Sequence, residues 1–180
     1  GIITHRRYRS FNELHIEGSE IIRSLPDTNV FFISNHQTYF ADVVAMFHVF
    51  NASLKGRENN IKNVLYLWNP KLNLYYVAAK ETMQEGLLPR ILAYAGAITV
   101  ERTWRAKGKD VTEKKEVNPN DTENIKIALE DGWVITFPQG TTRSFKPVRK
   151  GTAHIILQHK PIVVPIVIDG FRRSFDRKGL

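Results

Sequence analysis

A histidine and an aspartate near the start of the chain have the types and spacing needed to move a proton. His36 is followed by five residues and then by Asp42, within the segment Asn35 to Asp42. A histidine can take a proton from a hydroxyl near neutral pH, and a carboxylate on its other ring nitrogen fixes the tautomer and stabilises the imidazolium. The pair therefore indicates general-base chemistry. The simpler interpretation is that His36 is a structural cap and that Asp42 is a first-turn residue favoured by the helix dipole.

A second group of polar residues follows an apolar run later in the chain. Phe137 to Ser144 reads FPQGTTRS, and three basic residues come shortly afterwards, namely Lys146, Arg149 and Lys150. Gly140 permits close approach of a backbone, and Arg143 carries a planar fork of donors that suits a phosphate. The segment therefore indicates an anion site, although a Pro-Gly turn with incidental basic residues explains it equally well.

Two shorter blocks complete the set. Gly96 to Arg102 reads GAITVER, a strand that brings Arg102 to its end, where an ordinary surface pairing with Glu101 is the simpler interpretation. Val163 to Ile168 reads VVPIVI, which is typical of a core strand with a proline at an edge or a bulge.

The hydrophobic pattern predicts the strands and helices that must position these blocks. Short apolar runs predict strands at Val30–Ser34, Leu74–Ala79, Ala97–Glu101, Trp133–Phe137 and Ile162–Ile168. Amphipathic spacing predicts helices at Ala41–Phe50, Leu87–Ala95, Asp121–Glu130 and Val148–His159, with a marginal one within Phe11–Leu25 and a charged, solvated loop at Thr103–Asn120. Strands that are apolar on both faces and alternate with helices favour a single α/β domain with a largely parallel or mixed sheet flanked by helices. The histidine and arginine blocks follow strands, where open α/β sheets place their sites.

The composition limits the class of protein. A chain of 180 residues, 42% of them hydrophobic, can form one domain with a buried core. The absence of cysteine excludes disulfides, thiolate metal sites and a cysteine nucleophile. The net charge of +8 points to an anionic partner, whether a nucleic acid, a phospholipid headgroup or an acidic carrier protein. No apolar run reaches the roughly 18–20 residues that span a bilayer.

Taken together and in this order, the four blocks resemble those of the glycerolipid acyltransferase family, which includes bacterial 1-acyl-glycerol-3-phosphate acyltransferases. The family blocks are a His-four-residues-Asp motif, a Gly-x-x-x-(Ile/Val)-x-Arg block, Phe-Pro-Glu-Gly-Thr-Arg-Ser and an apolar Val-Pro-Val strand. The resemblance runs from Val30 to about Gly170, and it extends to two intervening segments, Val77–Glu81 and Lys150–Ala153.

The resemblance implies a glycerol-phosphate acyltransferase-like fold and an O-acyltransferase activity. Such an enzyme moves a fatty acyl group from acyl-CoA or acyl carrier protein to a lysophospholipid hydroxyl, with 1-acyl-glycerol 3-phosphate as the family's usual acceptor and phosphatidic acid as product. His36 is then the general base and Asp42 its orienting partner, and backbone amides near Gly140 and Thr141 are candidate oxyanion donors. The residues implied in substrate binding are Lys80, Arg102, Gln139, Gly140, Thr141 and Arg143. No metal and no cofactor beyond the thioester substrate is implied.

The sequence departs from the family pattern at three places. Five residues rather than four separate His36 from Asp42, and residues six apart on a regular helix point about 120° away from each other. Pairing therefore requires His36 to lie in the turn before the helix, with the extra residue absorbed as a wider loop or a π-bulge. Gln139 replaces a glutamate, which keeps hydrogen bonding but loses the charge. Thr142 is an extra residue, and we expect the two longer loops to reshape facing walls of one pocket.

A lipid acceptor implies that the active face lies at a membrane, as in a cytoplasmic protein peripheral to the inner face of the cell membrane. We expect residues 1–28 to form a basic arm and a marginal helix, residues 29–170 the acyltransferase domain and residues 171–180 a basic tail. The basic residues of arm and tail could bind anionic headgroups at roughly 1 kcal/mol each, or could simply be solvated; they are His5, Arg6, Arg7, Arg9, Arg172, Arg173, Arg177 and Lys178.

Three alternatives to the usual activity stay open at the level of the sequence. A lyso-aminolipid acceptor would need less phosphate recognition. A non-catalytic lipid-binding homologue gains support from the longer His–Asp spacing and from Gln139. A nucleic-acid-binding module would explain the charge, but the chain has no RNP-like, KH or zinc-finger pattern, and we expect no nucleic-acid partner.

Overall fold

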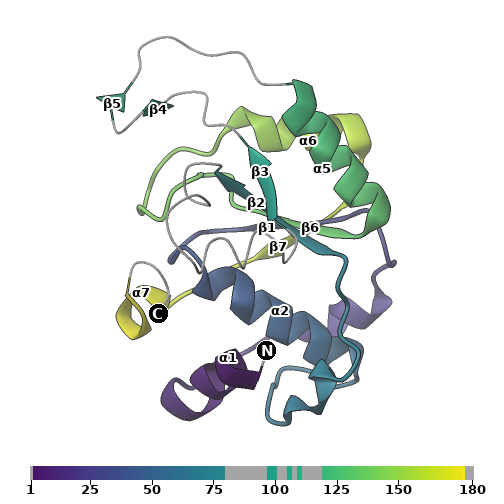
Figure 1. The fold of residues 1–180 in the computed structure, drawn as a ribbon, viewed down its shortest axis with the longest axis vertical. Coiled ribbons are helices and arrows are strands. Elements are labelled where there is room, and N and C mark those ends of the chain that lie inside the picture. Colours follow the sequence, from purple (N-terminus) through teal and green to yellow (C-terminus); the bar gives the residue numbers. More distant parts are fainter. Residues whose placement is uncertain (1, 80–96, 101–104, 107–108, 111–118, 177–180) are drawn as a thin grey trace.

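The fold is built on a five-stranded sheet in which every pairing is parallel. A computed structural model describes residues 2–79, 97–100, 105–106, 109–110 and 119–176. The strand order is β3-β2-β6-β1-β7 (Figure 1). The strands are β1 (Val30–Ser34), β2 (Leu74–Ala79), β3 (Ala97–Val100), β6 (Trp133–Thr136) and β7 (Ile162–Ile166). Two further short strands, β4 (Arg105–Ala106) and β5 (Lys109–Asp110), form a separate antiparallel pair.

Helices cover both faces of this sheet. Helices α5 and α6 lie over one face and α2 over the other, so the domain has three layers (Figure 1). The α-helices are α1 (Ile2–Arg6), α2 (Ala41–Leu54), α5 (Pro119–Asp131), α6 (Lys150–His159) and α7 (Phe171–Ser174). The shorter helical turns are η1 (Arg7–Phe11), η2 (Ser19–Ser24) and η3 (Val64–Leu67). Within the described residues, none of the helices has both the length and the apolar composition required to cross a bilayer.

The apolar runs of the central strands supply both layers of the core. Successive side chains of a strand point to opposite faces of the sheet. Phe32 therefore packs on the α2 side, where its ring stacks on Phe50 with centroids 4.3 Å apart, while Phe31 joins the cluster beneath α5 and α6. On β6, Trp133 likewise packs on the α2 side and Val134 joins the cluster beneath α5 and α6. A strand buried on both faces needs an uninterrupted apolar sequence, which is the pattern that the sequence shows.

The structure confirms the predicted α/β class with flanking helices, and it resolves the choice between a parallel and a mixed sheet in favour of a parallel one. Strands β1 and β2 have their predicted bounds, and β6 ends one residue and β7 two residues earlier than predicted. Strand β3 is described from Ala97 to Val100, and the last residue of its predicted range lies outside the described residues. The predicted helix at Ala41–Phe50 extends to Leu54, and the helix predicted at Asp121–Glu130 runs from Pro119 to Asp131. The predicted helix at Leu87–Ala95 and most of the loop predicted at Thr103–Asn120 lie outside the described residues.

The helix expected within Phe11–Leu25 does not form as one element. The residues after η1 run without helical structure to Gly18, and only the six residues of η2 are helical, as a 3₁₀ turn. Gly18 has a φ of 75°, in the left-handed region that interrupts a right-handed helix. The apolar spacing in this segment serves packing against the rest of the domain, because Ile22 is buried in the main core.

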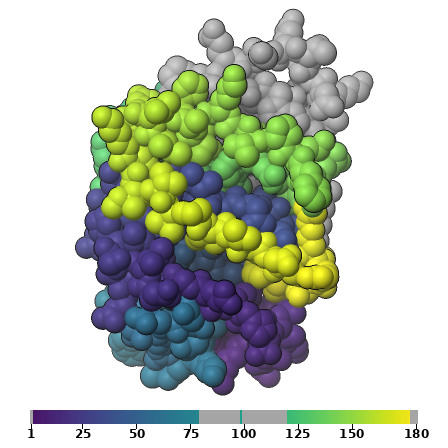
Figure 2. All heavy atoms as spheres, turned by 180° about the vertical axis from the view of Figure 1, so that it is seen from behind, coloured from purple at the N-terminus to yellow at the C-terminus, as the bar shows by residue number. Residues whose placement is uncertain are grey.

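The two chain ends pack against each other and against α2. His5 is buried and bonds through Nε2 to the Ile61 carbonyl at 2.6 Å. The buried Tyr8 hydroxyl donates to the Ala41 carbonyl at 2.7 Å, and its ring lies 5.6 Å from that of Phe175. Seen from behind, β7 and the residues after it form a yellow band between the purple-to-blue and the green parts of the chain (Figure 2). The described parts of the expected basic arm and tail thus also carry core contacts.

A histidine in the middle of α2 makes stability depend on pH. His48 is fully buried, with Nε2 at 2.8 Å from the Thr4 hydroxyl and Nδ1 at 2.8 Å from the Tyr66 hydroxyl. Burial is the main reason that the pKa of His48 falls to about 3, and the nearby His5 lowers it further. Between pH 6.5 and pH 3 the unfolded chain therefore binds a proton that the folded chain does not, so stability rises with pH across this window.

We expect the free energy of unfolding to fall as the pH is lowered from 6.5 towards 3, at up to about 1.4 kcal/mol per pH unit from this residue. Urea unfolding at several pH values measures the slope. His48→Gln keeps a donor and an acceptor but cannot titrate, so it should flatten the slope. An equal slope in the variant would assign the pH dependence to other groups.

Candidate active site

The structure pairs the histidine and the aspartate that the sequence singled out. His36 Nδ1 lies 2.9 Å from Asp42 Oδ2. The Asp42 side chain is fully buried, whereas that of His36 is 15% exposed. A carboxylate accepts hydrogen bonds but does not donate them, so Nδ1 carries the proton and Nε2 of the neutral ring carries the lone pair. This is the tautomer that a general base needs.

The loop before α2 accommodates the extra residue between the pair. Helix α2 begins at Ala41, so His36 lies in the preceding turn, and the residue is absorbed as a wider loop rather than as a π-bulge. The Asp42 carboxylate accepts hydrogen bonds from the backbone N–H of Gln37 at 2.7 Å and from the backbone N–H of Thr38 at 3.1 Å. The Thr38 hydroxyl also donates to Asp42 Oδ1 at 2.9 Å and accepts from the Asp42 amide at 3.3 Å. The aspartate thus organises the loop that carries its own histidine.

The two predicted loops meet at the carboxyl ends of neighbouring strands. Ile33 of β1 is in register with Thr136 of β6, so the two strands end side by side. The first residue after β6, Phe137, stacks on the His36 ring, with the centroids 4.1 Å apart and an angle of 22° between the planes. The extra residue Thr142 is buried. The two longer loops therefore lie side by side, and that they reshape facing walls of one pocket stays a prediction.

Two amides beside the histidine tie the loop to the segment after β7. The Asn35 side chain donates to the Ile168 carbonyl at 2.7 Å and accepts from the Ile168 amide at 2.7 Å. Gln37 Nε2 donates to the same carbonyl at 2.9 Å, and Gln37 Oε1 accepts from the Arg172 amide at 3.3 Å. Sequence reasoning assigned neither amide a role, because their partners lie more than 130 positions away.

The loop after β6 is shaped around Gly140. Its φ of 59° lies in the left-handed region, and the guanidinium of Arg149 occupies the space where a Cβ would stand. Arg149 also bonds to the loop through its own amide, to the Pro138 carbonyl at 3.0 Å, and through Nη2, to the Gly140 carbonyl at 3.3 Å. Sequence analysis gave Arg149 no role, and in the structure it stabilises this loop by packing against Gly140 and bonding to two of the loop's carbonyls.

One of the expected oxyanion donors is already engaged. The Gly140 amide donates to the Phe137 carbonyl at 2.8 Å and closes the turn. In this conformation it does not point to an oxyanion, and the amide of Thr141 remains the candidate of the two. The physical reason is that Pro138 and Gln139 are the central residues of a β-turn, in which the amide of the fourth residue, Gly140, bonds to the carbonyl of the first.

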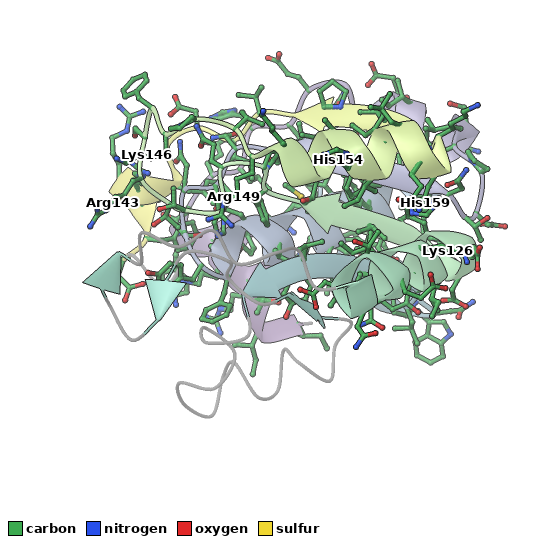
Figure 3. The ribbon with its side chains drawn as sticks, turned by 90° about the horizontal axis from the view of Figure 1, so that it is seen from above. Lys126, Arg143, Lys146, Arg149, His154 and His159 are labelled. Atoms are coloured by element: carbon green, nitrogen blue, oxygen red, sulfur yellow. The ribbon has the colours of Figure 1, made fainter. Side chains whose placement is uncertain are left out.

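The remaining predicted residues divide between described and undescribed parts of the chain. Gln139 Nε2 donates to the Lys146 carbonyl at 2.9 Å, so this side chain braces the loop. Thr141 accepts from the Arg143 amide through its hydroxyl at 3.2 Å, and the Arg143 side chain is exposed. Figure 3 shows Arg143, Lys146 and Arg149 towards one end of the molecule. The other two predicted substrate-binding residues, Lys80 and Arg102, lie outside the described residues.

Comparison with protein families identifies the class to which this fold and site belong. The Acyltransferase family model matches residues 13–169, which include both loops of the site. The chain belongs to the Acyltransferase family, and this membership supports an O-acyltransferase activity. Comparisons with curated proteins and with solved structures find no match.

Proposed function

We propose that this chain transfers a fatty acyl group from a thioester to the hydroxyl of a lysophospholipid, with 1-acyl-glycerol 3-phosphate as acceptor and phosphatidic acid as product. The observation that carries the proposal is the His36–Asp42 pair, whose buried carboxylate leaves Nε2 of a partly exposed ring as a base. The acyl donor is acyl-CoA or acyl carrier protein, which share the thioester.

The reaction needs one base that gives back its proton. Nε2 of His36 takes the proton from the acceptor hydroxyl as the oxygen attacks the thioester carbonyl. The tetrahedral intermediate collapses with cleavage of the carbon–sulfur bond, and the imidazolium returns its proton to the departing thiolate. The ester and the free thiol are the products, and no acyl-enzyme forms. Asp42 stabilises the imidazolium during the interval between the two proton transfers.

Basic residues on the loop after β6 are the proposed contacts of the acceptor phosphate. Arg143 follows the loop that stacks on His36, and its exposed guanidinium can form two parallel bonds to a phosphate. Lys80 and Arg102 are proposed to contribute to the same recognition. Gln139 and Gly140 shape the loop, and Thr141 is proposed to supply an amide to the oxyanion.

A membrane surface is the proposed place of action, as a cytoplasmic protein at the inner face of the cell membrane. Several large apolar side chains are strongly exposed near cations, among them Ile3 at 88%, Phe11 at 75% and Phe145 at 100%. Arg6 and Arg9 are exposed as well, and apolar residues among cations suit an anionic lipid surface. His5 is buried and Arg7 lies over the Phe175 ring, so these two members of the arm serve packing instead.

Product analysis tests this function directly. The purified chain is incubated with an acyl thioester and an equimolar mixture of 1-acyl-glycerol 3-phosphate, a zwitterionic lysophospholipid and a lyso-aminolipid, and the products are identified by mass spectrometry. The proposal predicts phosphatidic acid as the main acylated product. Acylation of the lyso-aminolipid alone would move the assignment to that acceptor, and the absence of any acylated lipid with both donors would favour a non-catalytic lipid-binding protein.

Replacing Arg143 by lysine should raise the KM for 1-acyl-glycerol 3-phosphate about 10-fold or more, because lysine keeps the charge but loses the planar fork. The KM for the acyl donor should change little, and Arg102→Lys should behave in the same way. Lys126→Gln serves as a control away from the site: Lys126 lies on α5, its side chain is 40% exposed, and it pairs with Glu123 at 3.1 Å. An acceptor KM that stays at the wild-type value in both arginine variants would contradict phosphate recognition by these residues.

A further inference from the structure

The segment after β7 brings a second arginine to the two loops of the site. Helix α7 follows Gly170, and its residue Arg172 is exposed. Its backbone amide donates to Gln37 Oε1 at 3.3 Å, beside His36. Its guanidinium Nη1 donates to the Ser144 hydroxyl at 2.6 Å, beside Arg143. Arg172 therefore connects the histidine loop with the arginine loop, although it lies outside the residues matched by the family model.

Aromatic packing fixes the position from which Arg172 reaches the site. Phe171 and Phe175 flank it on the chain, are both buried, and lie 5.3 Å apart between ring centroids. Both contact the buried Tyr8, with centroid distances of 6.2 and 5.6 Å. The backbone of α7 is thus anchored on both sides of Arg172, which restricts where its guanidinium can lie.

Most of the donors of this guanidinium are not used by its bond to Ser144. A guanidinium has five N–H donors, and the bond to the Ser144 hydroxyl uses one. This segment has two acids, Asp169 and Asp176. Asp169 pairs with the neighbouring Arg173 at 3.7 Å, and among the described residues no ion pair joins either acid to Arg172. Arg172 therefore presents an exposed cation at the site without a carboxylate partner among the described residues.

We propose that Arg172 and Arg143 together bind the phosphate of the acceptor, with Arg172 as a specificity-determining residue that the sequence motifs do not contain. This inference rests on the proposed function and deepens it. Arg143 precedes Ser144 in the chain and Arg172 bonds to the Ser144 hydroxyl, so the two arginines can offer several N–H donors to the three terminal oxygens of a phosphate monoester. A zwitterionic or neutral acceptor lacks this doubly charged group, so Arg172 favours phosphate-terminated acceptors.

The test compares steady-state constants of Arg172→Gln with those of two matched variants. Arg172→Gln should raise the KM for 1-acyl-glycerol 3-phosphate about 10-fold and leave the KM for acyl-CoA within about 2-fold. Arg173→Gln removes the same charge from the next residue, and Ser144→Ala removes the contact that Arg172 makes in the protein. Both should keep the acceptor KM within about 3-fold of wild type.

Each alternative has a distinct outcome. An equal rise of the acceptor KM in Ser144→Ala would show that Arg172 acts by holding the loop in place through Ser144. A rise in the KM for acyl-CoA alone would show that Arg172 binds a phosphate of the donor. Either result overturns the inference. An unchanged acceptor KM in Arg172→Gln overturns it as well.

A binding measurement separates the failure of this inference from the failure of the proposed function. Glycerol 3-phosphate is titrated into the wild-type protein and into the Arg172 and Arg173 glutamine variants, with NMR detection. Loss of binding in Arg172→Gln but not in Arg173→Gln supports the phosphate site even if no acyl transfer to 1-acyl-glycerol 3-phosphate is found. Equal binding by all three proteins, or no binding by the wild type, overturns the site.

Discussion

Replacing His36 by alanine is expected to lower kcat by about 10²–10⁴-fold, the usual contribution of a positioned general base. The variant should leave the acceptor KM nearly unchanged, because His36 acts on the hydroxyl in the transition state and the phosphate is bound elsewhere. Initial rates of phosphatidic acid formation at saturating donor and acceptor measure the effect. The fold should persist, since Asp42 keeps its bonds to the Gln37 and Thr38 amides.

His154→Ala provides the control for this variant. His154 is exposed on α6 and lies farther along the molecule than Arg143 and Lys146 (Figure 3), so its loss should leave kcat within about 2-fold of wild type. Thermal unfolding of both variants checks that the folded fraction is the same. A kcat for His36→Ala within a few-fold of wild type would remove this residue from the mechanism.

Replacing Asp42 by asparagine is expected to lower kcat by at least about 10²-fold, because an amide lacks the negative charge that stabilises the imidazolium, even where its oxygen keeps the bond to His36 Nδ1. Its oxygen can still accept from the Gln37 amide at the place of Oδ2, and its nitrogen then faces the Thr38 hydroxyl, which can accept. The loop should therefore keep its shape. The measurement is kcat together with the free energy of unfolding from urea titration.

Thr38→Val separates the catalytic from the structural role of this aspartate. The valine has a similar shape but lacks the hydroxyl that bonds to Asp42, so it perturbs the loop while the carboxylate stays beside His36. We expect a loss of about 1 kcal/mol in stability with a much smaller fall in kcat than in Asp42→Asn. If Asp42→Asn lowered stability alone and left kcat intact, Asp42 would be a loop-forming and helix-dipole residue only.

The part of the site that follows from local geometry could be predicted from the sequence. A buried parallel strand needs an unbroken apolar run, and Val30–Ser34 has one, so the place of the histidine at the strand's end follows from topology. Residues six apart on a regular helix point about 120° away from each other, so His36 and Asp42 cannot pair if both lie in the helix. This places the histidine in the preceding turn. The structure has that arrangement.

The contacts that support the site could not be predicted, because they join residues far apart in the chain. Nothing in the sequence around Asn35 indicates that its side chain bonds to Ile168, and nothing around Arg172 indicates that it reaches Ser144. The same is true of Gly140: a Cβ at this position would overlap the Arg149 guanidinium, and the sequence does not show where that guanidinium lies. The expected helix before β1 was wrong because one left-handed glycine outweighs apolar spacing.

We expect His36 and Asp42 to act as one unit in acyl transfer, and the kcat of the double variant His36→Ala/Asp42→Asn measures whether they do. An aspartate that works only through the histidine contributes nothing once the histidine is gone. We therefore expect phosphatidic acid formation by the double variant to be as slow as that by His36→Ala, within about 3-fold. A kcat reduced by the product of the two single effects would show that the residues act independently, and would contradict the account.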